Sequence, residues 1–265
     1  MVFDWPAFDW IYVASGLLVG FIVGMTGVGG GSLMTPILLH FGIAPSAAVG
    51  TDLLYAAITK AGGVFVHSKH DNINWRITGW LALGSLPASA ITLLAMHYIG
   101  FSGAGMNTFI KTMLGFALIF TALAIVFKQK LLDYSHRNDF WMTRMNPKQQ
   151  DIATVAVGVL LGAIVTITSI GAGAVGTVAL FLLYPLLPTT KLVGTEIAHA
   201  VPLTLLAGLG HAGFGNLNLG LLGNLLIGSL PGIYIGSHLA SNVADHYLRP
   251  ALAAILLFTG VKLVM

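Results

Sequence analysis

The sequence contains an internal duplication, because it matches itself without a gap when it is shifted by 144 residues. The matches fall on polar, glycine and proline positions, which a shared hydrophobic composition would not reproduce. We therefore expect two halves with the same order of structural elements. Matched positions include Gly27 with Gly171, Val49-Gly50-Thr51 with Val193-Gly194-Thr195, Asp52 with Glu196, His67 with His211, Asn72 with Asn216, Asn74 with Asn218, and Gly84-Ser85-Leu86-Pro87 with Gly228-Ser229-Leu230-Pro231.

Composition places both halves in a membrane. Of the 265 residues, 56% are hydrophobic and only 8% are charged, whereas a soluble domain carries about 25% charged residues. So few charges cannot cover the surface of a globule of this size, and the longer apolar runs reach the length that a transmembrane helix needs. The alternating pattern of an outer-membrane barrel is absent, so we expect an all-α polytopic membrane protein.

Each half is predicted to contain five segments, of which the first two are short. At 1.5 Å per residue, segment 33–41 is about 14 Å long, against roughly 30 Å of hydrocarbon. The first two segments of each half therefore form either a re-entrant hairpin or two short helices that meet at a glycine loop. The predicted segments are 11–25, 33–41, 47–66, 75–99 and 107–127 in the first half, and 153–170, 175–187, 191–210, 219–240 and 248–264 in the second.

Either arrangement gives an odd number of membrane crossings per half, which inverts the second repeat relative to the first. The chain then divides into a first transmembrane repeat (1–127), a basic linker (128–152) and a second repeat (153–265). Because lysine and arginine are enriched in cytoplasmic loops, the linker is predicted to be cytoplasmic and both termini extracytoplasmic. The N-terminus has no basic region of the kind that begins a signal peptide, so we expect segment 11–25 to remain.

Two glycine loops at equivalent positions are the strongest indication of a binding site. Glycine-interrupted short segments in matching places of two halves are typical of the substrate site of a secondary transporter. Helices that begin after such loops direct the positive ends of their dipoles toward the membrane midplane and can hold an anion. Alternatively, the glycines only allow close helix packing. The candidate substrate-binding residues of the loops are Gly27, Gly29, Gly30, Gly31, Ser32, Gly171 and Gly173.

Three ionisable residues lie within the predicted segments. Asp52 and Glu196 each follow Gly-Thr, and carboxylates inside a membrane are costly and usually functional. They could carry a proton during transport, or they could cap a helix at the membrane interface. Lys60 could balance an anionic substrate, pair with an acid or extend to the interface. We add Thr51, Thr195 and Lys60 to the candidate substrate site, with Asp52 and Glu196 as coupling or gating residues.

Histidines supply the remaining candidates. His199 follows Glu196 on the same helical face, but two side chains are too few for a metal, so we expect no metal and no cofactor. His67 and His211 are expected to begin the loops after the third segments, as pH-sensitive gates or as structural residues. The chain has no cysteine, which excludes disulfides and thiolate sites, and no basic stripe suited to nucleic acid.

The chain resembles the TauE/SafE sulfite-exporter family of membrane permeases. The resemblance rests on Gly-Met-Thr-Gly-Val-Gly-Gly-Gly-Ser at 24–32, the Pro-Ile-Leu run, Val-Gly-Thr-Asp at 49–52, the His-rich loop with Asn-Ile-Asn-Trp, and Gly-Ser-Leu-Pro-Gly at 228–232. It covers both halves outside 128–152, although the second glycine loop, Gly-Ala-Gly-Ala-Val, lacks the triple glycine. It implies a bacterial inner-membrane carrier of small sulfur-containing anions such as sulfite or sulfoacetate.

These observations predict a transporter that works by alternating access rather than an enzyme. An inside-negative potential favours exit of an anion by about 2.3 kcal/mol per charge per 100 mV, so export needs no second ion and is the expected direction. Uptake would need a coupled proton or cation at Asp52 or Glu196. An anion channel and a proton-coupled carrier of another organic anion remain alternatives. The expected partners are the anion and the lipid bilayer, and a homodimer is left open.

Overall fold

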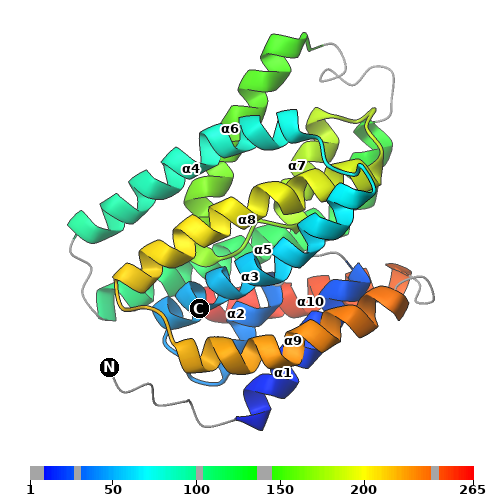
Figure 1. Ribbon diagram of the computed structural model, residues 1–265. Coiled ribbons are helices and arrows are strands. Elements are labelled where there is room, and N and C mark those ends of the chain that lie inside the picture. The colour runs from blue at the N-terminus through cyan, green and yellow to red at the C-terminus, as the bar shows by residue number, and fades with distance from the viewer. Residues whose placement is uncertain (1–8, 27–30, 100–103, 136–144, 240–244) are drawn as a thin grey trace.

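The computed structural model describes residues 9–26, 31–99, 104–135, 145–239 and 245–265, and in these ranges every regular element is an α-helix (Figure 1). The all-α prediction is therefore confirmed. The observed helices follow the predicted segments closely. They are α1 (Trp10–Thr26), α2 (Gly31–His40), α3 (Pro45–Lys69), α4 (Trp75–Tyr98), α5 (Ala104–Ser135), α6 (Pro147–Thr168), α7 (Ala174–Leu183), α8 (Thr189–Gly213), α9 (Leu219–Leu239) and α10 (Asp245–Val264).

Six of the helices in the described ranges are long and apolar enough to cross a membrane, namely α3, α4, α5, α6, α8 and α9. Shorter apolar stretches lie in α1, α7 and α10. Large apolar side chains such as Phe116, Phe120 and Phe258 are more than half exposed, which suits helices surrounded by lipid rather than by water. The chain is a multi-pass membrane protein.

Helix α6 is longer than the sequence predicts, because it begins at Pro147 within the polar linker rather than at residue 153. Asn146 caps this helix by accepting a hydrogen bond from the Gln149 N–H, and the Gln149 side chain accepts one from the Asn146 N–H. A capping box of this kind can start a helix within a polar stretch, because it needs no apolar side chain. The expectation that the first two segments of each half are short therefore holds for α1, α2 and α7 but not for α6.

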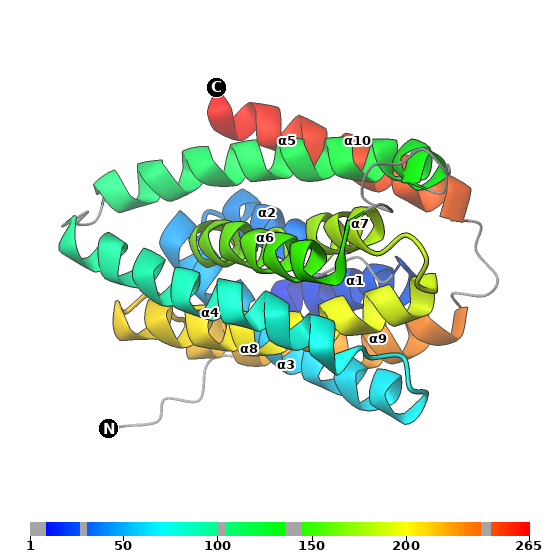
Figure 2. The same ribbon diagram turned by 90° about the horizontal axis from the view of Figure 1, so that it is seen from above.

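The two halves interlock through reciprocal helix pairs. Helix α1 packs along α9, α4 along α6, α3 against α8 and α5 against α10 (Figures 1 and 2). At the offset of 144 residues, α1 is equivalent to α6 and α4 to α9, so the first two pairs are the same contact with the halves exchanged. Such an exchange is the packing that a two-fold relation between repeats produces. Their inverted orientation in the membrane stays a prediction.

Glycines let the paired helices approach closely. A Cβ placed on Gly228 of α9 would lie 1.9 Å from the carbonyl oxygen of Val13 in α1. The equivalent residue of the first half, Gly84 of α4, would place a Cβ 2.1 Å from the carbonyl oxygen of Val155 in α6. Both distances are far below van der Waals contact, so any side chain at either position would separate the helices.

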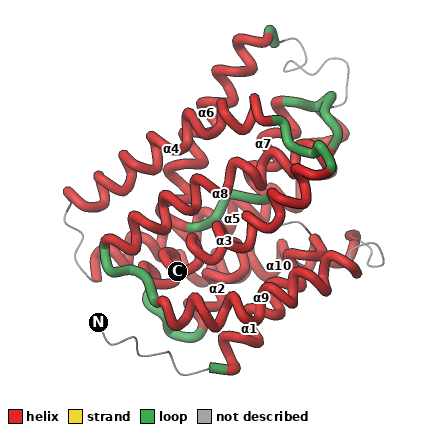
Figure 3. Tube along the Cα trace, in the orientation of Figure 1, coloured by secondary structure: helices red, strands yellow, loops and turns green. Residues whose placement is uncertain are grey.

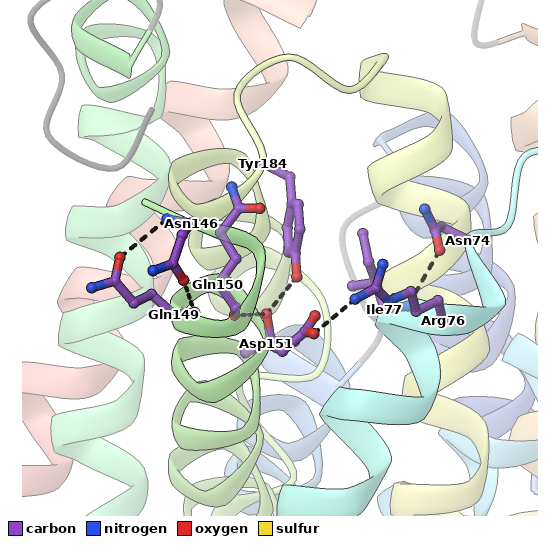
Figure 4. Close-up of polar contacts among 9 residues, drawn as sticks. Asn74, Arg76, Ile77, Asn146, Gln149, Gln150, Asp151 and Tyr184 are labelled. Atoms are coloured by element: carbon purple, nitrogen blue, oxygen red, sulfur yellow. Dashed lines mark hydrogen bonds and ion pairs between the residues drawn. The ribbon is translucent and has the colours of Figure 1, made fainter. Parts of the chain in front are cut away.

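Polar contacts fasten the ends of α4, α6 and α7 to each other, as Figure 4 shows. The Arg76 guanidinium at the start of α4 donates a hydrogen bond of 2.8 Å to the Asp151 carboxylate of α6. The hydroxyls of Thr154 and Tyr184 are 2.7 Å apart and join α6 to the segment after α7. Burial raises the pKa of the Tyr184 phenol above its ordinary value, since the charged form would be poorly solvated there.

Candidate functional site

The candidate site surrounds the non-helical link between α6 and α7, which lies in the middle of the bundle (Figure 3). Ser169, Ile170 and Ala172 of this link are buried. The backbone has positive φ at Ser169 (59°), Gly171 (115°) and Gly173 (157°), a region that glycine adopts far more readily than other residues. The sequence-predicted residues Gly171 and Gly173 therefore lie where the backbone turns between two helices inside the protein.

Lys60 connects α3 to this link. Its side chain is half-buried, and its ammonium donates a hydrogen bond to the carbonyl oxygen of Ala172. The positive charge of Lys60 also acts on Asp52, Glu196 and His199. The structure thus brings together four residues that the sequence places on two separate segments.

Asp52 lies on α3 with a fully buried carboxylate. Its Oδ2 accepts a hydrogen bond of 2.5 Å from the Thr35 hydroxyl of α2, while its Oδ1 has no partner among the described residues. The hydroxyl of Ser169 lies near this carboxylate and is also without a partner in the described ranges. Unpaired buried polar atoms are costly, so these two make the surroundings of Asp52 a candidate binding site.

Glu196 occupies the equivalent position on α8 and is 2% exposed. Its side chain packs against Gly176 of α7, where a Cβ would lie 3.1 Å from both Cγ and Oε1 of Glu196. The described residues provide no hydrogen-bond partner for Oε1. One turn later on the same face, His199 is fully buried, and its Nε2 is 2.8 Å from the Ser85 hydroxyl of α4.

The two carboxyl groups differ in their hydrogen-bond donors. Thr35 donates to Asp52, whereas the residue equivalent to Thr35 in the second half is Ala179, which has no hydroxyl. Lys60 itself is equivalent to Thr204, so the ammonium is supplied by the first half alone. The site is therefore chemically asymmetric although the repeats that form it are equivalent.

A second layer of contacts repeats in both halves. His199 of α8 contacts Ser85 of α4, and the equivalent residue on α3, Tyr55, interacts with Ser229 of α9. Both serines belong to the duplicated Gly-Ser-Leu-Pro motif. Each half thus uses its motif serine to hold the helix that carries the carboxyl group of the other half.

Thr51 and Thr195, predicted to bind substrate, use their hydroxyls to hold loops of the opposite half. The Thr51 hydroxyl accepts a hydrogen bond of 3.2 Å from the Asn218 N–H, and the Thr195 hydroxyl accepts one of 2.9 Å from the Asn74 N–H. The Thr195 hydroxyl also donates to the Lys191 carbonyl at 2.6 Å. Each threonine lies next to a buried carboxyl residue, but its oxygen is engaged with backbone.

The two predicted gating histidines lie in the last turns of α3 and α8 and not in the following loops. His211 is fully buried, with Nε2 2.8 Å from the carbonyl oxygen of Thr166 in α6. His67 lies against Gly194, where a Cβ would be 2.9 Å from the His67 Nδ1. The helices extend past the histidines because the turns that end them lie three to five residues later. There the N–H groups of residues 70–72 and 214–216 donate hydrogen bonds to the carbonyls of residues 67–68 and 210–212.

The first glycine loop can be described only in part. Gly31 begins α2 and Ser32 is buried. The predicted residues Gly27, Gly29 and Gly30 lie outside the described residues.

Sequence reasoning missed three hydroxyl side chains of the site: Thr35, Ser85 and Ser169. Thr35 could have been identified, because it is a polar residue within the apolar run 33–41 and a buried hydroxyl needs a hydrogen-bond partner. Ser85 stands in the duplicated Gly-Ser-Leu-Pro motif, whose copy at 84–87 we used only as evidence of the repeat. Ser169 has no counterpart in the first half, where the equivalent residue is Met25, so the repeat gave no indication of it.

Comparison with known proteins decides the family. The sequence model described as "Sulfite exporter TauE/SafE" matches residues 12–263. The chain belongs to the TauE/SafE family. This membership confirms the resemblance seen in the sequence and identifies a membrane transporter rather than an enzyme.

Individual relatives agree with this assignment. A probable membrane transporter protein of Bacillus subtilis, YjnA, is 39% identical over 252 residues, which cover 95% of this chain and 98% of that protein. The probable membrane transporter protein MJ0441 of Methanocaldococcus jannaschii is 29% identical over 73% of this chain and 69% of its own length. Comparison with solved structures finds no match.

Proposed function

We propose that this TauE/SafE-family transporter is a secondary carrier of a small sulfur-containing anion, such as sulfite or an organosulfonate, at the site around Lys60. The observation that carries the proposal is the hydrogen bond from the Lys60 ammonium to the link between α6 and α7. A positive charge inside a membrane bundle is costly and usually marks a substrate or ion pathway. At a break between two helices, it lies where secondary transporters bind their substrates.

The surroundings of Lys60 suit an oxyanion. The ammonium can donate three hydrogen bonds, and among the described residues one acceptor, the Ala172 carbonyl, takes one of them. Helix α7 begins at Ala174 directly after the link, so the partial positive charge of its first turn faces the same region. The free hydroxyl of Ser169 adds a donor. A sulfonate or sulfite group presents oxygens that accept hydrogen bonds from all three.

We propose that the carrier works by alternating access. A carrier needs two states, each open to one side, and the reciprocal pairs α1 with α9 and α4 with α6 are the candidates for the units that move against each other. We place the carrier in the bacterial inner membrane with residues 128–152 in the cytoplasm. For an anion that moves alone, the inside-negative potential drives export.

Binding to the purified protein tests the proposal. Sulfite, methanesulfonate, sulfoacetate, sulfate and acetate are compared by the rise in thermal unfolding temperature that each produces. Lys60→Met keeps the length of the side chain but removes the charge, and we expect it to weaken binding of the stabilising sulfur anion by roughly 10- to 100-fold, the effect of losing one hydrogen bond to a charged group.

Lys191→Met is the matched control, because within the described ranges the Lys191 ammonium pairs with the exposed Asp71 carboxylate, at 3.4 Å, and not with the site. We expect this variant to bind like the unaltered protein. Equal binding by the Lys60→Met protein would exclude Lys60 from the site, and stabilisation by none of the anions would refute anion transport.

A further inference from the structure

The charges at the site do not balance. Two buried carboxyl groups, Asp52 and Glu196, share a single ammonium, that of Lys60, which acts on both. With both acids ionised the three groups carry a net charge of one negative unit, and an arriving anion adds at least one more. In a region of low dielectric, like charges repel strongly, so the site accepts an anion readily only when one acid is neutral.

The hydrogen bonds indicate which acid is neutral. The Asp52 carboxylate accepts a 2.5 Å hydrogen bond from the Thr35 hydroxyl, and a hydrogen bond of this kind favours the charged form of a carboxyl group. Oε1 of Glu196 has no hydrogen-bond partner among the described residues, and the position equivalent to Thr35 is Ala179, which cannot donate a hydrogen bond. Glu196 is therefore the acid whose charge is less well stabilised.

We propose that each anion enters the site together with one proton, and that the proton is held by the carboxyl group of Glu196. This inference rests on the proposed function and adds its coupling ion. The balance is simple: the Glu196 carboxylate gains one proton when the anion binds and loses the same proton when the anion leaves. Anion and proton therefore cross in the same direction.

Helices α3, α4, α6 and α7 pack against α8, and among their described residues Lys60 is the charged group that acts on Glu196. Helix α3 contributes Lys60, and α8 itself contributes His199, whose Nε2 is engaged with Ser85 of α4. Helix α7 faces Glu196 with Gly176, which cannot titrate. Both Asp52 and Glu196 have one unpaired carboxyl oxygen among the described residues, but Glu196 is the one that packs against Gly176 of α7 and lacks a threonine donor like Thr35.

The coupling changes what drives transport. A monovalent sulfonate that moves with one proton carries no net charge, so the membrane potential does not affect it and a pH difference of one unit supports about a tenfold difference in concentration. A divalent anion with one proton still carries one negative charge, and for it the potential continues to favour export.

Methanesulfonate is the probe, because its sulfonate group stays ionised between about pH 6 and about pH 8 and does not itself exchange protons. Binding to the purified full chain is measured across this range, together with the protons taken up from a weakly buffered solution. We expect uptake of close to one proton per anion at the alkaline end, and a dissociation constant that rises by up to about tenfold per pH unit.

Three variants assign the proton. In Glu196→Gln the uncharged amide replaces the protonated acid, and we expect proton uptake to disappear and the dissociation constant to stop varying with pH. Glu196→Asp restores a carboxyl group and should restore proton uptake. Asp151→Asn is the control, because Asp151 pairs with Arg76 at the end of α6, away from the link, and it should behave like the unaltered protein.

The outcomes separate this inference from the proposed function. Methanesulfonate binding by the unaltered protein without proton uptake would refute the coupling and leave the anion carrier intact. Unchanged proton uptake in Glu196→Gln would refute the assignment to Glu196. The proton count of the unaltered protein decides the coupling even if the variants do not fold. Absence of binding of every sulfur anion at every pH would instead refute the proposed function itself.

Discussion

A single methyl group at Gly228 should separate α1 from α9. A Cβ at this position would lie 1.9 Å from the Val13 carbonyl oxygen, whereas ordinary van der Waals contact begins near 3.4 Å. The helices must therefore move apart by about 1.5 Å, the difference of these two distances. Forcing extra atoms into a packed interface costs typically about 1–3 kcal/mol, and alanine recovers at most about 1 kcal/mol of helix propensity over glycine.

Gly223 provides the control within the same helix. A Cβ on Gly223 has no atom within 4 Å, so Gly223→Ala gains helix propensity without a clash and should stabilise the protein slightly. Both variants gain the same helix propensity, so they differ by the overpacking cost of about 1–3 kcal/mol. Since 1 kcal/mol corresponds to about 2–4 °C in a protein of this size, the Gly228→Ala protein should unfold roughly 2–12 °C below the Gly223→Ala protein.

Thermal unfolding in detergent, followed by intrinsic fluorescence or circular dichroism, measures the difference between the two variants. The pair Gly84→Ala and Gly79→Ala repeats the experiment in α4, because Gly84 faces the Val155 carbonyl at 2.1 Å and Gly79 faces open space. Equal unfolding temperatures for Gly228→Ala and Gly223→Ala would show that α1 and α9 do not pack through Gly228.

Two further predictions concern single polar groups. Thr195→Val leaves the Asn74 N–H without its acceptor, and an unpaired buried donor should cost about 1–3 kcal/mol of folding free energy. The unfolding temperature of this variant is compared with that of Thr189→Val, a substitution at an exposed position. Equal unfolding temperatures would contradict the prediction. Burial raises the pKa of Tyr184 in the folded state above 10.0, so its contribution to stability is complete below about pH 10 and is lost as the pH rises further. Tyr184→Phe should remove that step from the pH dependence of unfolding, and an unchanged dependence would exclude Tyr184 as its source.

The helices were largely predictable because hydrophobicity reports directly on membrane segments. Helix α4 was expected at 75–99 and extends over Trp75–Tyr98, since the Asn74 side chain caps its first turn and a polar stretch precedes it. Helix α6 was misjudged because its first turn, Pro147-Lys148-Gln149-Gln150, is polar. A capping box depends on two specific side chains and leaves no trace in an average of hydrophobicity.

For the candidate site, the sequence predicted which residues could take part but not how they are arranged. Lys60, Asp52 and Glu196 were recognisable as charges within apolar segments. Their meeting at the link between α6 and α7 depends on the packing of α3 against α8, which no local pattern encodes. The roles of Thr51 and Thr195 also depend on this packing, because their hydrogen-bond partners belong to the opposite half of the chain.

The pairing of α1 with α9 imposes an order on assembly during synthesis. Helix α1 is synthesised before the other described helices, but its partner α9 is the ninth of these ten. At about 5–20 residues per second, roughly 10–40 s pass before α9 follows. Throughout this interval the glycine-containing face of α1 meets lipid or an insertion factor instead of a helix, while α4 and α6 can already associate. The contact between α1 and α9 therefore forms late in translation. In a chain truncated before α9, helix α1 has no helix to pack its glycine-containing face against.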